Sequence, residues 1–154
     1  VPVSEGVIDL SRLIRHDGTD LGSCLTLYTN ELGGRVAVSS YSPWKRIGLG
    51  PKRHQVIAVA DWLSKGRLPI IIDQTVRVAP FIRQSSDGRV VAVLFNTSLD
   101  PTGTLTVRLR AALGQVSMVF ANGFRPLSSR IDKGETIVEV PSIPPWTTIT
   151  LMGY

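Results

Sequence analysis

Residues 75–152 alternate short apolar segments with turn sequences, and this pattern restricts the possible folds more than any other feature of the chain. The turns contain glycine, asparagine or proline, which either tolerate positive φ or preset φ near the value a turn needs; they lie at residues 86–88, 100–103, 122–123, 132–134 and 144–145. We expect strands at residues 75–83, 89–96, 104–110, 115–121, 126–131, 135–140 and 147–152. About seven short strands at this spacing predict an antiparallel β-sandwich.

Two of these segments differ in how their apolar residues are distributed over the two faces of the strand. Residues 90–95 are apolar at every position, which suits a central strand covered on one side by the opposite sheet and on the other by the helical half or another domain. In residues 104–110, Leu105, Val107 and Leu109 alternate with polar residues, which predicts one buried and one solvated face. Packing alone accounts for both patterns, and neither segment needs a catalytic role to explain it.

The first half of the chain has a different pattern of predicted elements, which includes a helix. Strands are expected at residues 25–29 and 35–40, followed by a loop over 41–50 and a helix that ends at Lys65, before Gly66. Its apolar positions follow helical spacing, at Val56, Val59, Ala60 and Leu63. A strand at 68–72 would complete a βαβ-like unit. The predicted fold is therefore mainly β, with a small α/β segment (residues 1–73, one main helix) before an antiparallel β-sandwich (residues 74–154).

Composition excludes several classes of protein. The chain of 154 residues carries a net charge of +5, but its basic residues are scattered. The densest groups, Lys45-Arg46 and Lys52-Arg53-His54, lack interleaved aromatics, so we expect a solvated basic surface and no nucleic-acid partner. No apolar run has the roughly 18 residues that suggest a membrane helix, so no membrane partner is expected. A single cysteine, Cys24 in an apolar run, excludes an intrachain disulfide and predicts a buried thiol.

The chain starts at Val1-Pro2-Val3, without an initiator methionine, a basic region or an apolar signal core. We therefore expect either an excised piece of a longer chain or a processed product.

No catalytic residue, metal ligand or cofactor site is predicted. Glu135 and Glu139 fall on one sheet face, but at a sandwich surface they are expected to be solubilising rather than a glycosidase pair. His16 and His54 stand in no triad motif, and no Gly-x-Ser-x-Gly sequence exists. The sequence Asn96-Thr97-Ser98 formally matches a glycosylation acceptor, a match that is common by chance.

Three aromatic residues are candidates for stacking on a sugar ring: Tyr41, Trp44 and Trp146. All three lie in loops, where a binding platform can form, whereas Trp62 lies beside the apolar helix face and is expected in the core. Aromatic residues make up 6% of the chain, which is low for a dedicated carbohydrate-binding module. Packing against the sandwich or against a further domain is the favoured role of Tyr41 and Trp44.

Two sequence stretches resemble parts of known enzymes. "GRVVAVLFNTSLDPTGTLTVRL" (88–109) resembles the C-terminal β-sandwich that follows the catalytic barrel in many bacterial glycoside hydrolases. "GGRVAVSSYSPW" (33–44) and "HQVIAVADWLSKGRLPIIID" (54–73) resemble the last strand, helix and strand of the class I glutamine-amidotransferase-like domain, which lies between barrel and sandwich in some β-galactosidase-type enzymes. The resemblance covers residues 33–154 and leaves the first part unassigned.

The resemblance implies a non-catalytic C-terminal accessory region, with the catalytic carboxylates on a barrel outside this chain. Its expected partner is the catalytic domain of the parent chain, with carbohydrate as a further possible ligand. One alternative is a carbohydrate-binding module that uses Tyr41 and Trp44. The other, ranked last, is an α/β enzyme fragment with an incomplete active site.

Overall fold

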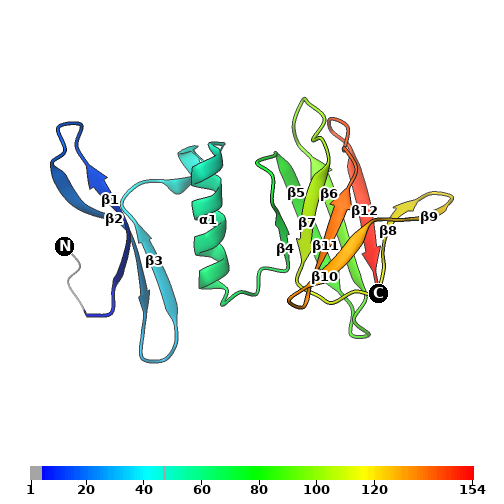
Figure 1. Cartoon of the computed structure of the whole chain (residues 1–154), viewed down its shortest axis with the longest axis horizontal. Coiled ribbons are helices and arrows are strands. Elements are labelled where there is room, and N and C mark those ends of the chain that lie inside the picture. The colour runs from blue at the N-terminus through cyan, green and yellow to red at the C-terminus, as the bar shows by residue number, and fades with distance from the viewer. Residues whose placement is uncertain (1–4, 47) are drawn as a thin grey trace. The chain divides into compact units, whose positions relative to one another are not determined.

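The computed structural model describes residues 5–46 and 48–154, apart from the side chains of residues 44 and 46. The chain forms two compact units, Val1–Gly66 and Arg67–Tyr154, called here the N-terminal and C-terminal units (Figure 1). This division differs by one strand from the boundary expected at residues 73 and 74. The strand β4 (Ile70–Ile72) belongs to the C-terminal unit because it pairs with a strand there.

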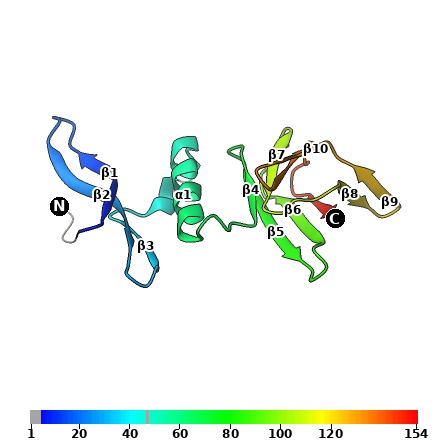
Figure 2. The ribbon, with the colours of Figure 1, turned by 60° about the horizontal axis from the view of Figure 1, so that its bottom comes forward.

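The N-terminal unit contains a three-stranded antiparallel sheet, in the order β1-β2-β3 (Figure 2). The strands span Ile8–Ile14, Asp20–Thr29 and Arg35–Ser39. The hairpin between β1 and β2 was not expected from the sequence. Its turn is built around Asp17 and Gly18: Thr19 N–H donates to Asp17 Oδ1 at 2.9 Å, and Gly18 has a φ of 88°. An Asp-Gly pair after the alternating Ile8-Asp9-Leu10-Ser11 is a recognisable hairpin sequence.

After β3 come a short 3₁₀ helix, η1 (Pro43–Arg46), and the helix α1 (Gly50–Leu63). Pro51 occupies the first turn as expected. The helix ends at Leu63 rather than Lys65, because Lys65 and Gly66 both take positive φ and their N–H groups bond to Trp62 O and Asp61 O. No residue of α1 is fully buried. The expected core position of Trp62 is therefore wrong: its side chain is half-buried, with the Arg35 guanidinium 5.0 Å from the ring centroid.

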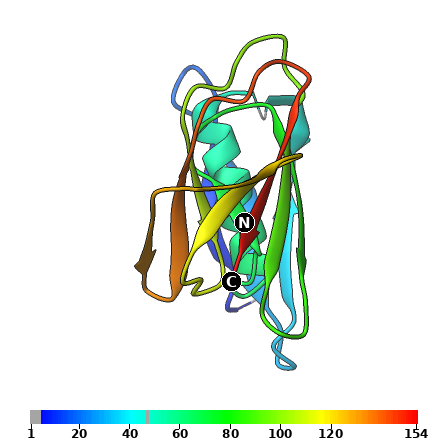
Figure 3. The same cartoon turned by 90° about the vertical axis from the view of Figure 1, so that its right-hand side faces the viewer.

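The C-terminal unit is an antiparallel β-sandwich, which confirms the predicted fold class (Figure 3). One sheet has four strands in the order β10-β11-β7-β4, and the other has five in the order β5-β6-β12-β8-β9. The remaining bounds are β5 Val78–Gln84, β6 Val90–Asn96, β7 Leu105–Leu109, β8 Val116–Phe120, β9 Gly123–Pro126, β10 Ser129–Asp132, β11 Glu135–Val140 and β12 Thr148–Gly153.

The two sheets share one hydrophobic core. Val90, Ala92 and Leu94 of β6 point into it and are at most 3% exposed. Leu105, Val107 and Leu109 of β7 are at most 1% exposed, which confirms the alternation predicted for that strand.

Two expectations about strand pairing are wrong. The single strand expected at 126–131 is divided: Pro126 ends β9 in the five-stranded sheet, and Ser129 starts β10 in the four-stranded sheet. The βαβ-like unit does not form either, because β3 and β4 lie in different sheets and β4 pairs antiparallel with β7. Within the described residues, no helix is long and apolar enough to cross a membrane.

Candidate functional site

The structure divides the candidate sugar-stacking residues between the two units. Tyr41 follows β3 in the N-terminal unit, and Trp146 precedes β12 in the C-terminal unit. Trp44 falls in η1, and its side chain lies outside the described part of the structure. Each described candidate therefore has to be judged by its own surroundings.

Tyr41 is held by a polar cluster at the start of α1. Its hydroxyl donates to Gln55 Oε1 at 2.9 Å and accepts from Lys52 Nζ at 3.0 Å. Lys52 Nζ also donates to Gln55 Oε1 at 3.1 Å and lies 4.6 Å from the centroid of the Tyr41 ring. Lys52 Nζ therefore lies at the hydroxyl end of the Tyr41 side chain.

An apolar cavity of about 220 Å³ lies beside Tyr41, between α1 and the sheet. Its lining consists of Leu25, Ala37, Ser39, Tyr41, Pro43, Gln55, Val56, Val59, Ala60 and Leu63. The predicted apolar face of α1 therefore points toward β2 and β3 but leaves a space in between. This cavity was not expected from the sequence, where its signal is the pair of small residues Ala37 and Ala60 on facing elements.

Trp146 is an exposed aromatic residue in a constrained loop. Its side chain is 61% exposed, its φ is 52°, and its ring centroid lies 6.1 Å from that of Phe95. A positive φ is uncommon for a bulky residue and persists only where the surroundings impose it. Here Pro144 and Pro145 precede the tryptophan, and Thr147 Oγ1 donates to Pro145 O at 3.0 Å.

Asn96 at the end of β6 holds this loop in place through hydrogen bonds of its side-chain amide. Its side chain is fully buried, and Nδ2 donates to the carbonyl oxygens of Asp100, Ile143 and Pro144 at 2.8, 3.0 and 3.1 Å. Oδ1 accepts from Ser98 N–H at 3.0 Å. With both ends of the amide engaged inside the protein, Asn96 is inaccessible as a glycosylation acceptor in the folded chain.

The outer face of the five-stranded sheet is largely apolar, although Arg83, Ser117 and Thr150 also lie on it. One row of residues in register crosses all of its strands: Phe81, Val93, Thr150, Val119 and Phe124. Phe81 is 64% exposed and Phe124 is 62% exposed, while Val93 and Val119 are half-buried. We call this row, together with Val91, Phe95 and Met152 on the same face, the apolar outer face.

The outer face of the four-stranded sheet carries several charged residues, and Ile71 and Ile137 lie on it beside Arg108. Arg108 Nε lies 2.8 Å from Asp73 Oδ1, and Arg110 forms an ion pair with Glu135 at 2.8 Å. Glu139 Oε1 accepts from Thr106 Oγ1 at 3.3 Å. Glu135 and Glu139 thus have separate partners on a sheet surface, a surface arrangement with no cleft to hold a scissile bond between them.

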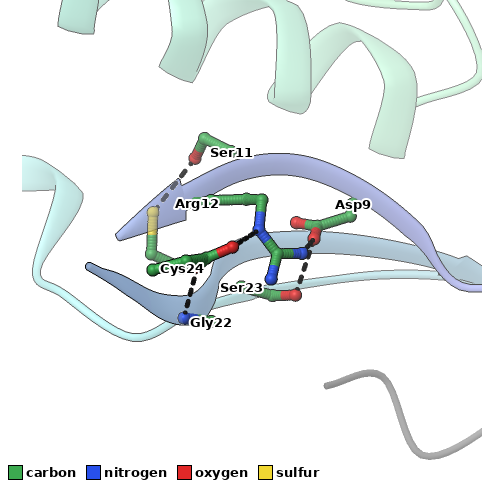
Figure 4. Close-up of polar contacts among 7 residues, drawn as sticks. Asp9, Ser11, Arg12, Gly22, Ser23 and Cys24 are labelled. Carbon is green, nitrogen blue, oxygen red and sulfur yellow. Dashed lines mark hydrogen bonds and ion pairs between the residues drawn. The ribbon is translucent and has the colours of Figure 1, made fainter. Parts of the chain in front are cut away.

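A second group of charges lies on the β1–β2 hairpin (Figure 4). Arg12 bonds Asp20 Oδ2 at 2.6 Å and Asp9 Oδ2 at 2.7 Å, and Ser23 Oγ donates to Asp9 Oδ2 at 2.7 Å. The hydrogen bond from Arg12 lowers the pKa of Asp20, so this carboxyl stays ionised and is unsuited to act as a general acid. Cys24 is buried, as predicted, with Sγ 3.2 Å from Ser11 Oγ.

No group of three or more His, Cys, Asp or Glu side chains that suits a metal ion occurs among the described residues.

No family model matches the chain, and no curated protein does either. Among solved structures, a rhamnosidase from Novosphingobium sp. PP1Y matches 64% of this chain at 18% identity, with a TM-score of 0.54. An α-L-fucosidase isoenzyme 2 from Paenibacillus thiaminolyticus matches 88% of it at 11% identity, with a TM-score of 0.58. At these identities the likeness shows the fold alone. The chain spans 10% and 22% of the lengths of these two proteins.

Proposed function

We propose that this chain is a non-catalytic accessory region of a glycoside hydrolase, and that it packs through its apolar outer face on the catalytic domain of the parent chain. Two glycosidases contain a similar fold as a small part of a much longer chain, which supports this context. On the sequence resemblance alone, we further propose that the parent is a β-galactosidase-type enzyme with an amidotransferase-like segment.

The difference between the two outer faces of the sandwich carries the proposal. A row of four apolar residues, with Thr150 in the middle, crosses the five strands of one sheet, whereas the other sheet carries ion pairs such as Arg108–Asp73. Neighbouring strands are about 4.8 Å apart, so the row is roughly 19 Å wide. Contiguous exposed apolar surface of this kind marks an interaction site, since its burial is worth roughly 25 cal/mol per Å².

The arrangement of acidic residues supports a non-catalytic role. Glycoside hydrolysis uses two carboxyl groups that flank the scissile bond. Here Asp9 and Asp20 share Arg12, Asp73 pairs with Arg108, and Glu135 pairs with Arg110. We therefore expect the purified chain to hydrolyse no aryl glycoside. Turnover that survives repeated purification and disappears on substitution of one acidic residue would contradict the proposal.

A matched pair of substitutions tests the docking surface. Phe81→Glu changes an exposed residue of β5, an edge strand of the five-stranded sheet, and Ile131→Glu changes one of β10, an edge strand of the other sheet. In the full-length parent enzyme, we expect Phe81→Glu to lower the thermal midpoint and Ile131→Glu to leave it unchanged. In the separate chain, neither change should alter stability strongly. Equal effects of the two variants in the parent enzyme would rule out docking through this face.

Carbohydrate binding is the second candidate function, and the exposed, constrained Trp146 favours it. A flat side chain held in a fixed orientation stacks on a sugar ring with little loss of conformational entropy. Titration of the chain with a panel of oligosaccharides separates the two functions. A measurable affinity that Trp146→Ala abolishes favours sugar binding. If the chain binds no glycan in the panel, docking on the catalytic domain is the single function that is left.

A further inference from the structure

The cavity of the N-terminal unit has the size of a small-molecule site. Its volume is about 220 Å³, and an apolar cavity of about 150 Å³ in another protein binds benzene. The space therefore accommodates one aromatic ring with a short tail. Val56, Val59 and Leu63 on α1 and Leu25 on β2 provide an aliphatic wall.

The two ends of the cavity differ in polarity. Arg35 at the start of β3 donates from Nη1 to the carbonyl oxygen of Trp62, near the end of α1, at 2.6 Å. The helix and β3 therefore run antiparallel, and the start of α1 lies near the end of β3. The polar lining residues Ser39, Tyr41 and Gln55 consequently gather at one end, while Ala37 and Leu63 belong to the other.

Positive charge lies next to the polar end: Lys52 does not line the cavity itself but bonds to Tyr41 and Gln55, which do. Lys52 Nζ bonds only to the neutral Tyr41 hydroxyl and Gln55 Oε1, and in the described part of the chain it has no carboxylate partner. The first turn of α1 has no acidic residue, and its start has no side-chain cap. Arg53 lies in the same turn, with Nε buried and without a hydrogen-bond acceptor among the described residues. Cations at a helix N-terminus are unfavourable unless an anion is present nearby.

We propose that this cavity binds a small organic carboxylate with a compact apolar tail. The carboxylate interacts with Lys52 Nζ and the Gln55 amide, and the tail fills the space along Val56, Val59 and Leu63. A sugar is a poor occupant, because most of its hydroxyls would face aliphatic side chains without hydrogen-bond partners. Ser39 Oγ cannot easily serve them, since it already donates to Tyr41 O at 2.7 Å.

Calorimetric titration of the full 154-residue chain with 3-phenylpropionate, and with the neutral 3-phenylpropanol, tests the site. We expect the carboxylate to bind with a Kd of at most about 1 mM and the alcohol to bind more weakly. Lys52→Met should weaken carboxylate binding about tenfold, because a hydrogen bond to a charged group is lost, and should change alcohol binding little. Lys133→Met, which removes the same charge from the C-terminal unit, is the matched control.

Methyl NMR locates the ligand independently of affinity. Resonances of Val56, Val59 and Leu63 should shift on titration, whereas those of Val107 and Leu109 in the sandwich core should not. Ala60→Leu fills the cavity and should abolish both the shifts and the heat of binding, with the circular dichroism spectrum showing that the chain is still folded. Absence of binding by the unchanged chain, or equal affinity for the carboxylate and the alcohol, would overturn the proposal.

Discussion

Asn96 and Ile143 lie far apart in the sequence, yet Asn96 Nδ2 donates to the Ile143 carbonyl oxygen at 3.0 Å inside the C-terminal unit. Further bonds connect the same two loops: Thr102 N–H donates to Ile143 O at 3.2 Å, and Ile143 N–H donates to Thr102 Oγ1 at 3.0 Å. One buried amide thus joins the loop after β6 to the loop before β12. It also determines the position of Trp146, because Pro144 O is another of its acceptors.

Asn96→Ala should destabilise the chain strongly. The change removes a fully buried amide that donates to Ile143 O and Pro144 O; Ile143 O keeps its bond from Thr102 N–H, whereas Pro144 O loses its donor from Asn96, and an unsatisfied group costs about 1–3 kcal/mol. We expect a loss of about 2–4 kcal/mol in the free energy of unfolding, measured by urea denaturation. Asn122→Ala, at an exposed turn asparagine, is the control and should cost less than about 1 kcal/mol. Equal losses in the two variants would show that the amide has no special role.

Thr136→Val tests a second buried polar link. Thr136 is fully buried, and its Oγ1 donates to Ala111 O at 2.6 Å and accepts from Leu113 N–H at 2.9 Å. Valine keeps the shape but leaves both backbone groups unpaired, so we expect a loss of about 1–3 kcal/mol in chemical denaturation. Thr136→Ser keeps the hydroxyl and should cost less than the valine variant. The reverse order would mean that the methyl group, and not the hydroxyl, stabilises this position.

Much of the sandwich was predictable from local sequence because strands have a period of two. Leu105, Val107 and Leu109 point inward as their alternation predicts, and β6 ends at Asn96 as expected. The uniformly apolar segment 90–95 correctly indicated a strand with apolar residues on both faces. The local sequence does not specify which other part of a protein packs on the outer side of Val91 and Val93, because that contact is non-local.

Apart from the end of α1, which is at Leu63 and not at Lys65, the incorrect expectations concern non-local relationships. The partner of β4 is β7, in which Leu109 pairs with Ile70 and Val107 with Ile72, and an apolar run such as Ile70–Ile72 does not encode so distant a partner. The division of 126–131 depends on a crossing between sheets, in which Leu127 N–H bonds to Val116 O and Glu139 N–H bonds to Ser128 O. Similarly, the hydrogen bond from Lys52 Nζ to the Tyr41 hydroxyl depends on the side-chain conformation of Lys52, which spacing alone does not specify.

The β5–β6 turn should make stability depend on pH. Hydrogen bonds from Arg89 and Ser85 hold the pKa of Asp87 well below its ordinary value of 3.8. A lowered pKa in the folded state means that the ionised carboxylate stabilises the fold above the unfolded pKa and that this contribution is lost as the pH falls below it. Asp87→Asn should therefore lower the thermal midpoint at pH 7, with the difference shrinking below about pH 4.

The control for this pH series is Asp132→Asn in the β10–β11 hairpin, where the described residues provide no ion pair for the carboxylate. Thermal melts followed by circular dichroism at pH 7, 4 and 2 would compare the two variants. A difference between Asp87→Asn and the unchanged chain that stays constant across the series would contradict the proposed coupling to Arg89.

Gly153 at the end of β12 should tolerate no side chain. A Cβ added there would lie 2.5 Å from Leu113 Cδ1 and 3.4 Å from Val116 Cγ2, and Leu113 is only 4% exposed. Gly153→Ala should therefore cost about 1–3 kcal/mol in urea denaturation, the usual range for overpacking. Gly114→Ala meets only an ordinary contact, at 3.5 Å from Tyr154 O, and should change stability by less than about 0.5 kcal/mol.

The cost of Gly153→Ala should depend on Leu113. In a Leu113→Ala background the clashing atoms are absent, so the added methyl group enters a space that the leucine has left. The double variant should then be at least as stable as Leu113→Ala alone, which gives a coupling energy of about 1–3 kcal/mol in a double-mutant cycle. An unchanged cost in both backgrounds would mean that strain in the β12 backbone, and not contact with Leu113, requires glycine at this position.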